Sequence, residues 1–385
     1  MAIETSASER LKRELQGFRF CFPIMDRLGE FLEADQNNHV RGKVIGWHCH
    51  LTSITAATAQ VMVTAGVRLF LSECNPHTTD HDSVSYMQSL GAQVFTGAQS
   101  VEKVLAAAPV LTSDTGFVLT RAAIAGGRLP FAGNEITSSG VSALRALPAV
   151  PMPVININDG QLKHNIENFH GVGDGVIDAL FKLTGRVWSG RPVAVLGYGR
   201  VGAGVARYLQ QLGAVVAIAE VDPVRQLMAH YDGFALTSLA QALPQSELLI
   251  TASGSRSPVP EQLWHTARPG MVVLNVAHFA SELDSLKETA TAVTPFSEHL
   301  ERVQLEGTHV LMATSGSPAN VVMLTGSAEP CLIHLTTEML SLNYLGALLD
   351  RGESLPAGEH KVPYEVERQS SLLALAALDG SAAQP

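Results

Sequence analysis

The sequence is poor in the features that mark nucleic-acid-binding and membrane proteins. Of its 385 residues, 26 are Lys or Arg against 36 Asp or Glu, so the net charge is −10. A protein that follows a phosphate backbone needs clustered basic residues, so nucleic acid is not an expected partner. No run reaches the roughly 18 consecutive apolar residues of a membrane span, and the start of the chain shows no apolar signal segment. We therefore expect a cytoplasmic protein with no membrane partner.

Cysteine is also scarce. The four cysteines, Cys21, Cys49, Cys74 and Cys331, lie far apart and form no C-x-x-C pair. This spacing argues against a disulfide framework and predicts reduced, mostly structural thiols. Apolar residues, by contrast, make up 46% of the chain, which is enough for two buried cores in a chain of this length.

From residue 43 onward, short β-rich runs alternate with helical stretches. The first set includes the strand candidates 43–51, 67–74 and 92–97, and a second set runs from about 191 to 310. Strands separated by about a dozen helical residues indicate βαβ units and a parallel sheet. The predicted fold class is therefore α/β, with parallel sheets in two domains.

At the start of the second set, the stretch 193–212 is typical of a dinucleotide-binding loop. Gly197, Gly199 and Gly202 form G-x-G-x-x-G between an apolar strand and a helical run. The three glycines permit a tight turn, a close approach of backbone N–H groups to a pyrophosphate, and close packing of the helix. The second domain is therefore expected to be of the Rossmann type.

An acidic residue after the next strand indicates which dinucleotide binds. Glu220 lies where a carboxylate binds the ribose diol and would repel a 2′-phosphate, so the expected cofactor is NAD rather than NADP. Arg225 is the one nearby residue that favours NADP, and its simpler interpretation is a solvated helix charge.

A second motif, "NDGQLKHNIENF" (158–169), precedes this loop. Asn158 or Asp159 is a candidate helix N-cap, and Lys163 and Glu167 then share one helix face at i, i+4. On an arbitrary helix such a pair is most simply a surface ion pair.

Taken together, the motifs of residues 46–326 resemble S-adenosylhomocysteine hydrolase, which cleaves a nucleoside thioether with a permanently bound NAD. The matching segments follow one another in the family's order: "HLT" (50–52), "CN" (74–75), "SDTG" (113–116), "NEITSSG" (134–140), "NINDGQLKHNIEN" (156–168), "GYGRVG" (197–202), "EVDP" (220–223), "NVAHF" (275–279) and Asn320. This order and spacing are more specific than any single motif.

The resemblance implies a domain arrangement. Residues 1–165 and about 320–360 would form the substrate domain, and about 166–315 the NAD-binding Rossmann domain. The segment 361–385 would be a C-terminal part shorter than the family's. A small-molecule nucleoside substrate and a homo-oligomer, dimer or tetramer, are the implied partners, and no metal is expected.

The resemblance also implies a chemistry. NAD oxidises the ribose 3′-hydroxyl to a ketone, which acidifies the C4′ hydrogen, so that the 5′ substituent leaves by β-elimination. Water then adds to the alkene and the stored hydride returns to C3′. Lys163 would assist deprotonation of the 3′-hydroxyl, a role that needs a desolvated lysine, and Glu167 would orient it from a position where the family has an aspartate. Asp114 and His50 match positions for acid/base work near C4′ and C5′, and His278 follows a strand end that faces the sugar.

Two sets of binding residues are implied in the same way. Substrate contacts are expected at Thr52, Ile54, Glu135, Ile136, Asn158 and Ser327. Cofactor contacts are expected at Thr137, Ser138, Ser139, Asn168, Gly197, Gly199, Arg200, Val201, Gly202, Glu220, Ser253 and Asn320.

Several substrate positions depart from the family in one direction. Ile54 replaces a group that reads the adenine amino group, Ile136 a carboxylate beside the ribose hydroxyls, Phe117 an aspartate, Val172 a cysteine, and Ser327 a histidine near the base. Each substrate polar group left unpaired costs ~1–3 kcal/mol, so the ordinary substrate should be recognised poorly. The hypothesis is a nucleoside 4′,5′-dehydratase that expels a 5′-hydroxyl as water. A true S-adenosylhomocysteine hydrolase is the alternative.

Two further classes of protein fit parts of the sequence. "HCH" (48–50) and "NPHTTDHD" (75–82) supply histidines and acids for a metal-dependent hydrolase, but the fold that usually carries such a pair would lack a dinucleotide loop in mid-chain. A non-catalytic NAD- or nucleoside-binding protein is disfavoured because it would not need the proton-transfer set of His50, Asp114, Lys163 and His278.

Overall fold

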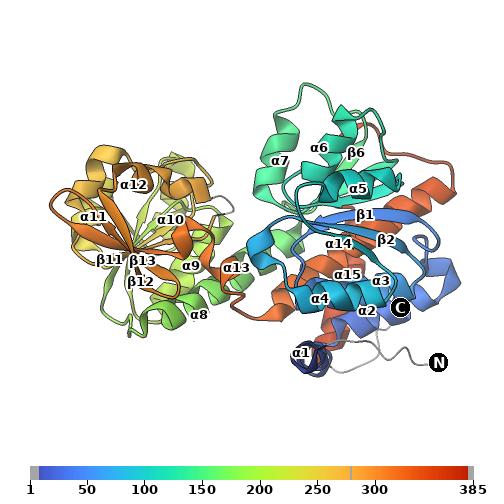
Figure 1. Ribbon diagram of the computed structural model, residues 1–385, viewed down its shortest axis with the longest axis horizontal. Helices are drawn as coiled ribbons and strands as arrows, with labels where there is room; N and C mark the ends of the chain where they lie inside the picture. The colour runs from blue at the N-terminus through green and yellow to red at the C-terminus, as the bar shows by residue number, and fades with distance from the viewer. Residues whose placement is uncertain (1–7, 278–279, 380–385) are drawn as a thin grey trace. The chain divides into compact units, whose positions relative to one another are not determined.

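Parallel sheets are present in both halves of the chain, as the sequence predicts. The computed structural model describes residues 8–277 and 280–379, so His278 lies outside the described residues. The chain divides into unit 1, residues 1–164 and 328–385, and unit 2, residues 165–327. Each unit is a sheet with helices on both faces, which confirms the α/β fold class (Figure 1). Within the described residues, no helix is long and apolar enough to cross a membrane.

Unit 1 is built on a seven-stranded parallel sheet of order β15-β6-β5-β4-β1-β2-β3. Its strands are β1 (Val44–Cys49), β2 (Arg68–Glu73), β3 (Gln93–Phe95), β4 (Leu111–Asp114), β5 (Ala132–Glu135), β6 (Pro153–Asn156) and β15 (Gly358–Lys361). The chain moves outward from β1 to β3, then returns to start β4 on the other side of β1. The connections therefore diverge between β1 and β4, the type of place where α/β proteins bind ligands.

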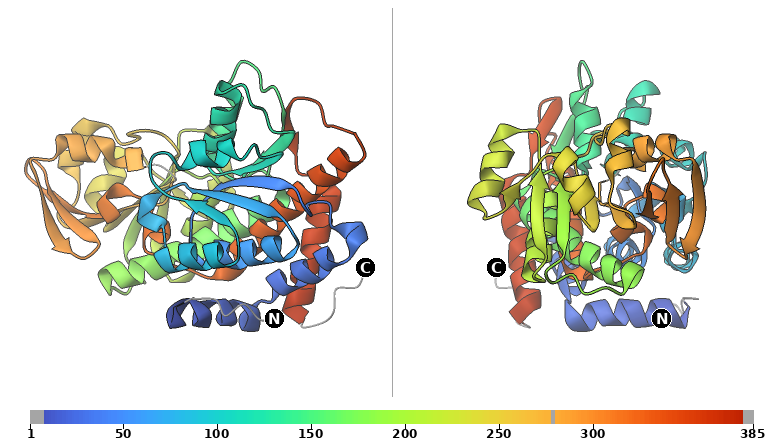
Figure 2. Two further views of the ribbon diagram at one scale, coloured as in Figure 1. Left: turned by 45° about the vertical axis from the view of Figure 1, so that its right-hand side comes forward. Right: turned by 90° about the vertical axis from the view of Figure 1, so that its left-hand side faces the viewer.

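The helices of unit 1 form a layer on each face of this sheet. One layer holds α3 (Ser53–Thr64), α4 (His81–Ser89) and α14 (Ala328–Asp350), and α14 also packs on α2 (Ile24–Glu33) and α15 (Tyr364–Asp379) (Figures 1 and 2). The other layer holds α5 (Ser100–Ala106), α6 (Val118–Ala125) and α7 (Ser138–Arg145). Helix α14 is buried along most of its length, so the last part of the chain completes the core of unit 1.

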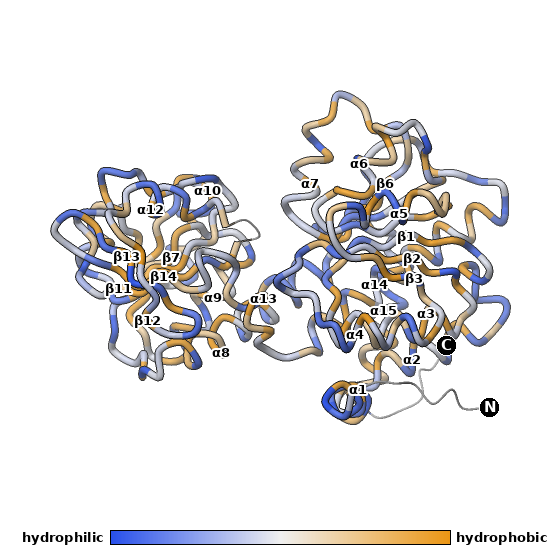
Figure 3. The backbone as a smooth tube through the Cα atoms, viewed as in Figure 1, coloured by the Kyte–Doolittle hydropathy of each residue, from blue (hydrophilic) through white to orange (hydrophobic). Residues whose placement is uncertain are grey.

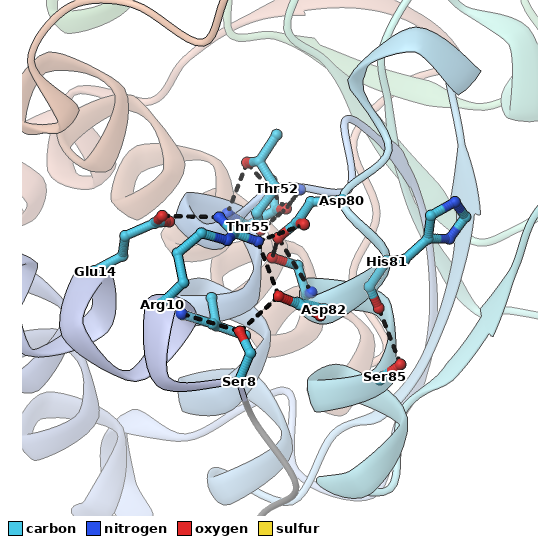
Figure 4. Close-up of polar contacts among 11 residues, drawn as sticks. Ser8, Arg10, Glu14, Thr52, Thr55, Asp80, His81, Asp82 and Ser85 are labelled. Atoms are coloured by element: carbon cyan, nitrogen blue, oxygen red, sulfur yellow. Dashed lines mark hydrogen bonds and ion pairs between the residues drawn. The ribbon is translucent and has the colours of Figure 1, made fainter.

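A polar cluster fastens the first helix, α1 (Glu9–Cys21), to the start of α4 (Figure 4). Arg10 Nη2 donates to Asp80 Oδ1 at 2.6 Å and to Asp82 Oδ2 at 3.2 Å, and Ser8 Oγ donates to the same Asp82 oxygen at 2.5 Å. Asp80 is also the N-cap of α4, because it accepts from Ser83 N at 3.2 Å. One carboxylate thus serves a helix cap and an ion pair.

Unit 2 has an eight-stranded sheet of order β12-β13-β14-β11-β10-β7-β8-β9. Its strands are β7 (Pro192–Leu196), β8 (Val215–Ala219), β9 (Ala235–Leu236), β10 (Leu248–Thr251), β11 (Met271–Asn275), β12 (Ala292–Ser297), β13 (Leu300–Gln304) and β14 (His309–Ala313). Its helices are α8 (Val172–Thr184), α9 (Arg200–Gln211), α10 (Pro223–Tyr231), α11 (Leu239–Gln245), α12 (Asp284–Thr289) and α13 (Ala319–Val322). Here the connections diverge between β7 and β10.

The edge of this second sheet differs from the wholly parallel sheet that the sequence predicts. Strand β12 pairs antiparallel with β13, and β13 pairs antiparallel with β14. Only Glu298 and His299 separate β12 from β13, and so short a connection permits a hairpin but not a parallel crossover.

Burial follows the alternation of the strands and helices. In unit 2, the middle strands β7, β10 and β11 carry mostly Val, Ile, Leu and Ala, and Figure 3 shows much of this sheet in the hydrophobic colour. In β4 and β5 of unit 1, however, the polar residues Ser113, Asp114, Asn134 and Glu135 are also fully buried. The core of unit 1 therefore contains charges that its own donors must stabilise.

Replacing Asp80 should weaken the attachment between α1 and α4. We expect D80A to lower the free energy of unfolding by about 1 kcal/mol, because it removes an N-cap and an ion pair that is largely solvent-screened. D80N is the matched control, since asparagine retains the cap without the charge. Chemical denaturation of the two variants and the wild type measures this, and a D80A as stable as the wild type contradicts the assignment.

The contribution of Asp80 should also depend on pH. Burial raises the pKa of Asp80, but the hydrogen bonds from Arg10 and Ser83 outweigh it and hold the pKa below its usual value. The stabilisation is therefore complete above the pKa of the unfolded chain and lost as the pH falls through the lower folded value. The stability difference between the wild type and D80N should shrink in acid over that range.

Candidate functional site

The candidate residues of unit 1 gather where the parallel strands end. His50 follows β1, Asp114 closes β4, Glu135 closes β5 and Asn158 follows β6. Because parallel strands present their carboxyl ends at one edge of the sheet, these side chains share that edge. Strands β1 and β4 are direct neighbours at the divergence point, so His50 and Asp114 mark its centre.

The loop after β1 fixes the orientation of His50. His50 Nδ1 lies 2.7 Å from Thr78 Oγ1, and the His50 carbonyl accepts from Thr55 Oγ1 at 2.7 Å. Thr52 is the N-cap of α3 and forms a capping box with Thr55, so its hydroxyl serves the helix. Thr55, in the first turn of α3, thus holds the His50 backbone, and Thr78 holds the His50 ring.

Asp114 is fully buried and caps helix α6. Its carboxylate accepts from the backbone N–H groups of Val118 at 3.0 Å, Leu119 at 3.2 Å and Thr120 at 2.6 Å. Burial raises the pKa of Asp114, while His48 and these N–H groups lower it. The proposed acid/base group is therefore also the structural anchor of the β4–α6 loop.

Glu135 holds two site loops together. Its carboxylate accepts from Gly116 N at 3.1 Å, Phe117 N at 2.7 Å, Thr137 N at 2.7 Å and Thr137 Oγ1 at 2.6 Å. Burial and the charge of Asp114 raise its pKa to about 8, although these donors oppose the shift. Both oxygens of this predicted substrate contact thus serve the chain's own donors.

The start of α7 joins the loop after β6. Thr137 is the N-cap of α7, and Ser139 Oγ lies 3.2 Å from its hydroxyl. Ser138 Oγ donates to Asn158 Oδ1 at 3.0 Å, and Asn158 Nδ2 donates to Asp159 at 2.8 Å. The structure therefore brings together one predicted substrate contact, Asn158, and three predicted cofactor contacts.

Lys163 begins a π-helix, Lys163–Gly171, rather than the α-helix that the sequence predicts. A π-helix bonds i to i+5 and is found mostly as short insertions at functional sites. Lys163 is buried, with a relative exposure of 8% for the residue. Asn168 on the same helix is also buried, and Glu167 is half-buried.

The apolar replacements in unit 1 lie at this same edge. Ile136 directly follows β5 and is buried, and Phe117 is fully buried at the start of α6. Phe117 has a left-handed backbone with φ 59°, an unfavourable conformation for a large residue that its N–H bond to Glu135 helps to hold. Ile54, in the first turn of α3, is partly buried.

In unit 2, the three glycines have the geometry that a dinucleotide loop requires. Gly197 has φ +98°, and a Cβ on Gly202 would lie 2.1 Å from the Gly197 carbonyl oxygen. Gly199 is the N-cap of α9 and caps it with no side chain, and the nearest atom to a Cβ placed there is Arg225 Nη1 at 3.8 Å. The start of α9 thus carries no side chain that would block the approach of a pyrophosphate to its N–H groups at Gly199.

The acid at the end of β8 is held by the backbone. Glu220 Oε2 accepts from Tyr198 N at 2.6 Å, and Oε1 accepts from Val221 N at 2.7 Å and Asp222 N at 3.0 Å. Arg225, which is largely exposed, lies 3.6 Å from Asp222 in an ion pair. The arrangement keeps a carboxylate beside the glycine loop and gives Arg225 an acidic partner.

Three further predicted cofactor residues lie in unit 2. Ser253 follows β10, across the divergence point from Gly197, and the guanidinium of Arg200 lies 4.6 Å from the centroid of the Phe169 ring. Val201 packs against the core. The buried Oδ1 of Asn320 has no hydrogen-bond partner within the described residues. An unpaired amide oxygen and an open glycine loop fit a bound dinucleotide carrying a carboxamide.

Two predicted substrate-side positions of unit 2 have local roles. Ser327 Oγ donates to Asp174 Oδ2 at 2.8 Å and is exposed, and Val172 begins α8. Neither position supplies a buried polar group.

A buried polar network behind the unit 1 site was missed by the sequence reasoning. His48, on β1, lies opposite the end of β4 and 2.9 Å from Ser72 Oγ, and burial lowers its pKa. Glu338, on α14, accepts a hydrogen bond from Ser113 of β4. A signal was present, because His334, Glu338 and Ser341 recur three to four residues apart on a helix whose other residues are mostly apolar. The described residues contain no group of three or more His, Cys, Asp or Glu side chains arranged to hold a metal ion.

Comparison with known proteins agrees with this geometry. Residues 168–326 match the family model described as S-adenosyl-L-homocysteine hydrolase, NAD binding domain. An adenosylhomocysteinase of Halobacterium salinarum is 29% identical, covering 92% of this chain and 87% of that protein. An S-inosyl-L-homocysteine hydrolase of Methanocaldococcus jannaschii is 26% identical, covering 95% and 92%.

Among solved structures, an L-alanine dehydrogenase matches at 16% identity and a TM-score of 0.40, covering 89% of this chain and 96% of that one. This likeness is too distant to bear on function. The matched segment indicates that residues 168–326 bind NAD, and over nearly its whole length the chain is similar to enzymes named for hydrolysis of S-nucleosyl homocysteines.

Proposed function

We propose that this chain is a nucleoside 4′,5′-dehydratase that removes the 5′-hydroxyl of an adenosine-type nucleoside as water. The observation that carries the proposal is the composition of the unit 1 edge. This edge retains His50, Asp114 and a buried Lys163, while Ile136 and Phe117 beside them are buried and apolar. The proton-transfer groups are thus kept and the polar contacts to the family's substrate are changed.

The proposed steps assign a role to each retained group. When bound, NAD supplies the redox chemistry, accepting a hydride from C3′ and later returning it. Lys163, as the neutral amine, takes the proton of the 3′-hydroxyl, and Glu167 orients the Lys163 side chain. Asp114 and His50 then move the protons at C4′ and at the departing 5′ oxygen.

The hydrogen bonds of the site support these roles. Thr78 holds Nδ1 of His50, so the opposite ring nitrogen, Nε2, is the one assigned to the 5′ oxygen. Three N–H groups hold the Asp114 carboxylate rigidly, and a fixed group needs little reorganisation during the reaction. Burial of Asp114 and Lys163 excludes water from these two groups and strengthens the electrostatic interactions of each charge.

The apolar replacements bear on the leaving group. Without the carboxylate that Ile136 replaces, a substrate with the family's usual hydroxyl pattern leaves one polar group unpaired, at a cost of ~1–3 kcal/mol. Phe117 adds bulk and removes a second polar contact. Relatives named for both adenosyl and inosyl substrates show that the base varies among similar proteins. A nucleoside with a plain 5′-hydroxyl needs fewer contacts from the protein than one that carries homocysteine.

A second candidate is a hydrolase that releases homocysteine from an S-nucleosyl homocysteine. The names of the Halobacterium and Methanocaldococcus relatives favour it. In that case water re-adds at C5′ after elimination, and the same residues act in reverse order. A non-catalytic NAD- or nucleoside-binding protein is the third outcome to be tested.

The released cofactor and the products should separate these candidates. We expect denatured protein to release NAD, and we expect the native protein to lose one water from a 5′-hydroxy nucleoside with a transient rise in reduced nicotinamide absorbance. Mass spectrometry of incubations with 5′-hydroxy nucleosides, S-adenosylhomocysteine and S-inosylhomocysteine measures this. Homocysteine release would instead establish the hydrolase, and bound NAD without any oxidation would establish the binding protein.

Replacing Lys163 should stop the oxidation and spare cofactor binding. We expect K163M to retain NAD and to lower the rate of nicotinamide reduction by about a hundredfold or more, because a positioned general base contributes at least about that factor. K182M is the matched control, since Lys182 is an exposed lysine of α8 paired with Asp178. Stopped-flow absorbance measures the rate, and an unchanged rate in K163M would remove Lys163 from the mechanism.

A further inference from the structure

The loop after β2 supplies the residue that contacts the ring of His50. This loop contains a short 3₁₀ turn, Pro76–Thr78, which Asn75 caps through its side chain. Strands β1 and β2 pair along their whole length, so the loops that follow them are neighbours. Asp80 N donates to the Leu51 carbonyl at 2.8 Å, which joins the two loops. The turn is therefore held in a fixed place beside His50.

The hydroxyl of Thr78 has two contacts, which together set the direction of both hydrogen bonds. Thr78 Oγ1 lies 2.9 Å from the Asn75 carbonyl oxygen and 2.7 Å from His50 Nδ1. A hydroxyl carries one hydrogen, and a carbonyl oxygen can only accept. The hydroxyl hydrogen therefore goes to Asn75, because otherwise two acceptors would face each other at a residue that is 3% exposed. His50 Nδ1 is then the donor to Thr78, so the neutral ring carries its hydrogen on Nδ1.

The Asn75 carbonyl oxygen is able to accept this hydrogen. It also accepts from Thr78 N at 3.1 Å, which closes the turn, and its two lone pairs allow both bonds. Thr79 Oγ1 lies 3.2 Å from the same oxygen, but this hydroxyl has a shorter bond to Glu73 Oε2 at 2.8 Å. The hydroxyl of Thr79 is thus engaged with Glu73, and the Asn75 oxygen remains the acceptor for Thr78.

We propose that Thr78 is a positioning residue that holds the neutral His50 ring in its Nδ1–H form, so that Nε2 meets the nucleoside as a proton acceptor. The order of events at His50 follows from this form. Nε2 cannot protonate the 5′ oxygen until it has itself gained a proton, so His50 acts first as a base and then as an acid. The inference rests on the proposed role of His50 in the dehydratase reaction.

The proton that C4′ loses supplies the one that the 5′ oxygen gains. After the 3′-hydroxyl has been oxidised, the C4′–H bond breaks and the proton passes to Nε2, which gives an imidazolium that still donates from Nδ1 to Thr78. The electron pair left on C4′ forms the C4′=C5′ double bond as the C5′–O5′ bond breaks. The departing hydroxide takes the Nε2 proton and leaves as water, and His50 returns to its neutral Nδ1–H form. The elimination needs no proton from solvent.

Nitrogen NMR should show this form of the ring in the protein without substrate. In histidine-labelled protein at a pH where the rings are neutral, we expect a His50 signal, assigned by its absence in H50Q, that is protonated on Nδ1. In T78V the ring should shift to the Nε2–H form that histidine prefers in water, whereas T78S should keep the wild-type form. T79V is the matched control, because it removes the next hydroxyl of the same loop, which bonds Glu73. A wild-type ring protonated on Nε2, or a T78V ring unchanged from the wild type, would overturn the proposal.

A kinetic test separates this proposal from the dehydratase proposal. In T78V, nicotinamide reduction should keep its rate, because Lys163 serves the oxidation, whereas water loss should slow about tenfold or more, since it depends on a positioned acid/base group. Reduced nicotinamide should therefore accumulate in T78V but not in T78S or T79V. Equal slowing of both steps, or unchanged water loss, would overturn the positioning role. If no nucleoside reduces the cofactor in the wild type, the dehydratase proposal fails, and the NMR comparison alone decides whether Thr78 sets the form of His50.

Discussion

Both units depend on the divergence of crossover connections in a parallel sheet. A parallel sheet presents all its carboxyl ends at one edge, and a change in the direction of the connections separates the loops at one place on that edge. In unit 1 this place lies between β1 and β4 and holds His50 and Asp114, whereas in unit 2 it lies between β7 and β10 and holds Gly197 and Ser253. Topology therefore places the residues proposed for acid/base chemistry at this edge of unit 1 and the dinucleotide-binding loop at the corresponding edge of unit 2.

The candidate site of unit 1 also depends on the electrostatics of its buried carboxylates. Three carboxylates, Asp114, Glu135 and Glu338, are buried near one another. Burial raises the pKa of each, and the charge of Asp114 adds to the rise at Glu135 and Glu338. The chain stabilises the first two with backbone N–H groups from helix starts and loops, and the third with Ser113 and Lys163. The same hydrogen bonds that make these charges tolerable also fix the site loops, so stability and preorganisation have one source.

The sequence predicted what depends on local pattern and missed what depends on tertiary contact. The glycine loop was predictable because the strand, the three glycines and the helix are adjacent in sequence, and each glycine has a known steric role in such a loop. The antiparallel β12–β13 hairpin was missed although its two-residue connection is local, because apolar alternation alone does not give strand direction. The π-helix at Lys163 and the pairing of Ser113 with Glu338 depend on packing between segments far apart in the chain, and no short-range signal specifies them.

The residues at the candidate site of unit 1 differ in how firmly the fold holds them. Asp114 and Glu135 are tied into helix caps and loop closures, so replacing them would disturb the fold as well as the reaction. Ile54 and Ile136 lie in the first turn of a helix and just after a strand, where a side chain can change without loss of a cap. A chain can thus exchange its polar substrate contacts for apolar ones while its proton-transfer groups stay in place. Because the fold constrains Asp114 but not Ile54 or Ile136, we expect the oxidation and elimination steps of the resembled family to act on a different nucleoside.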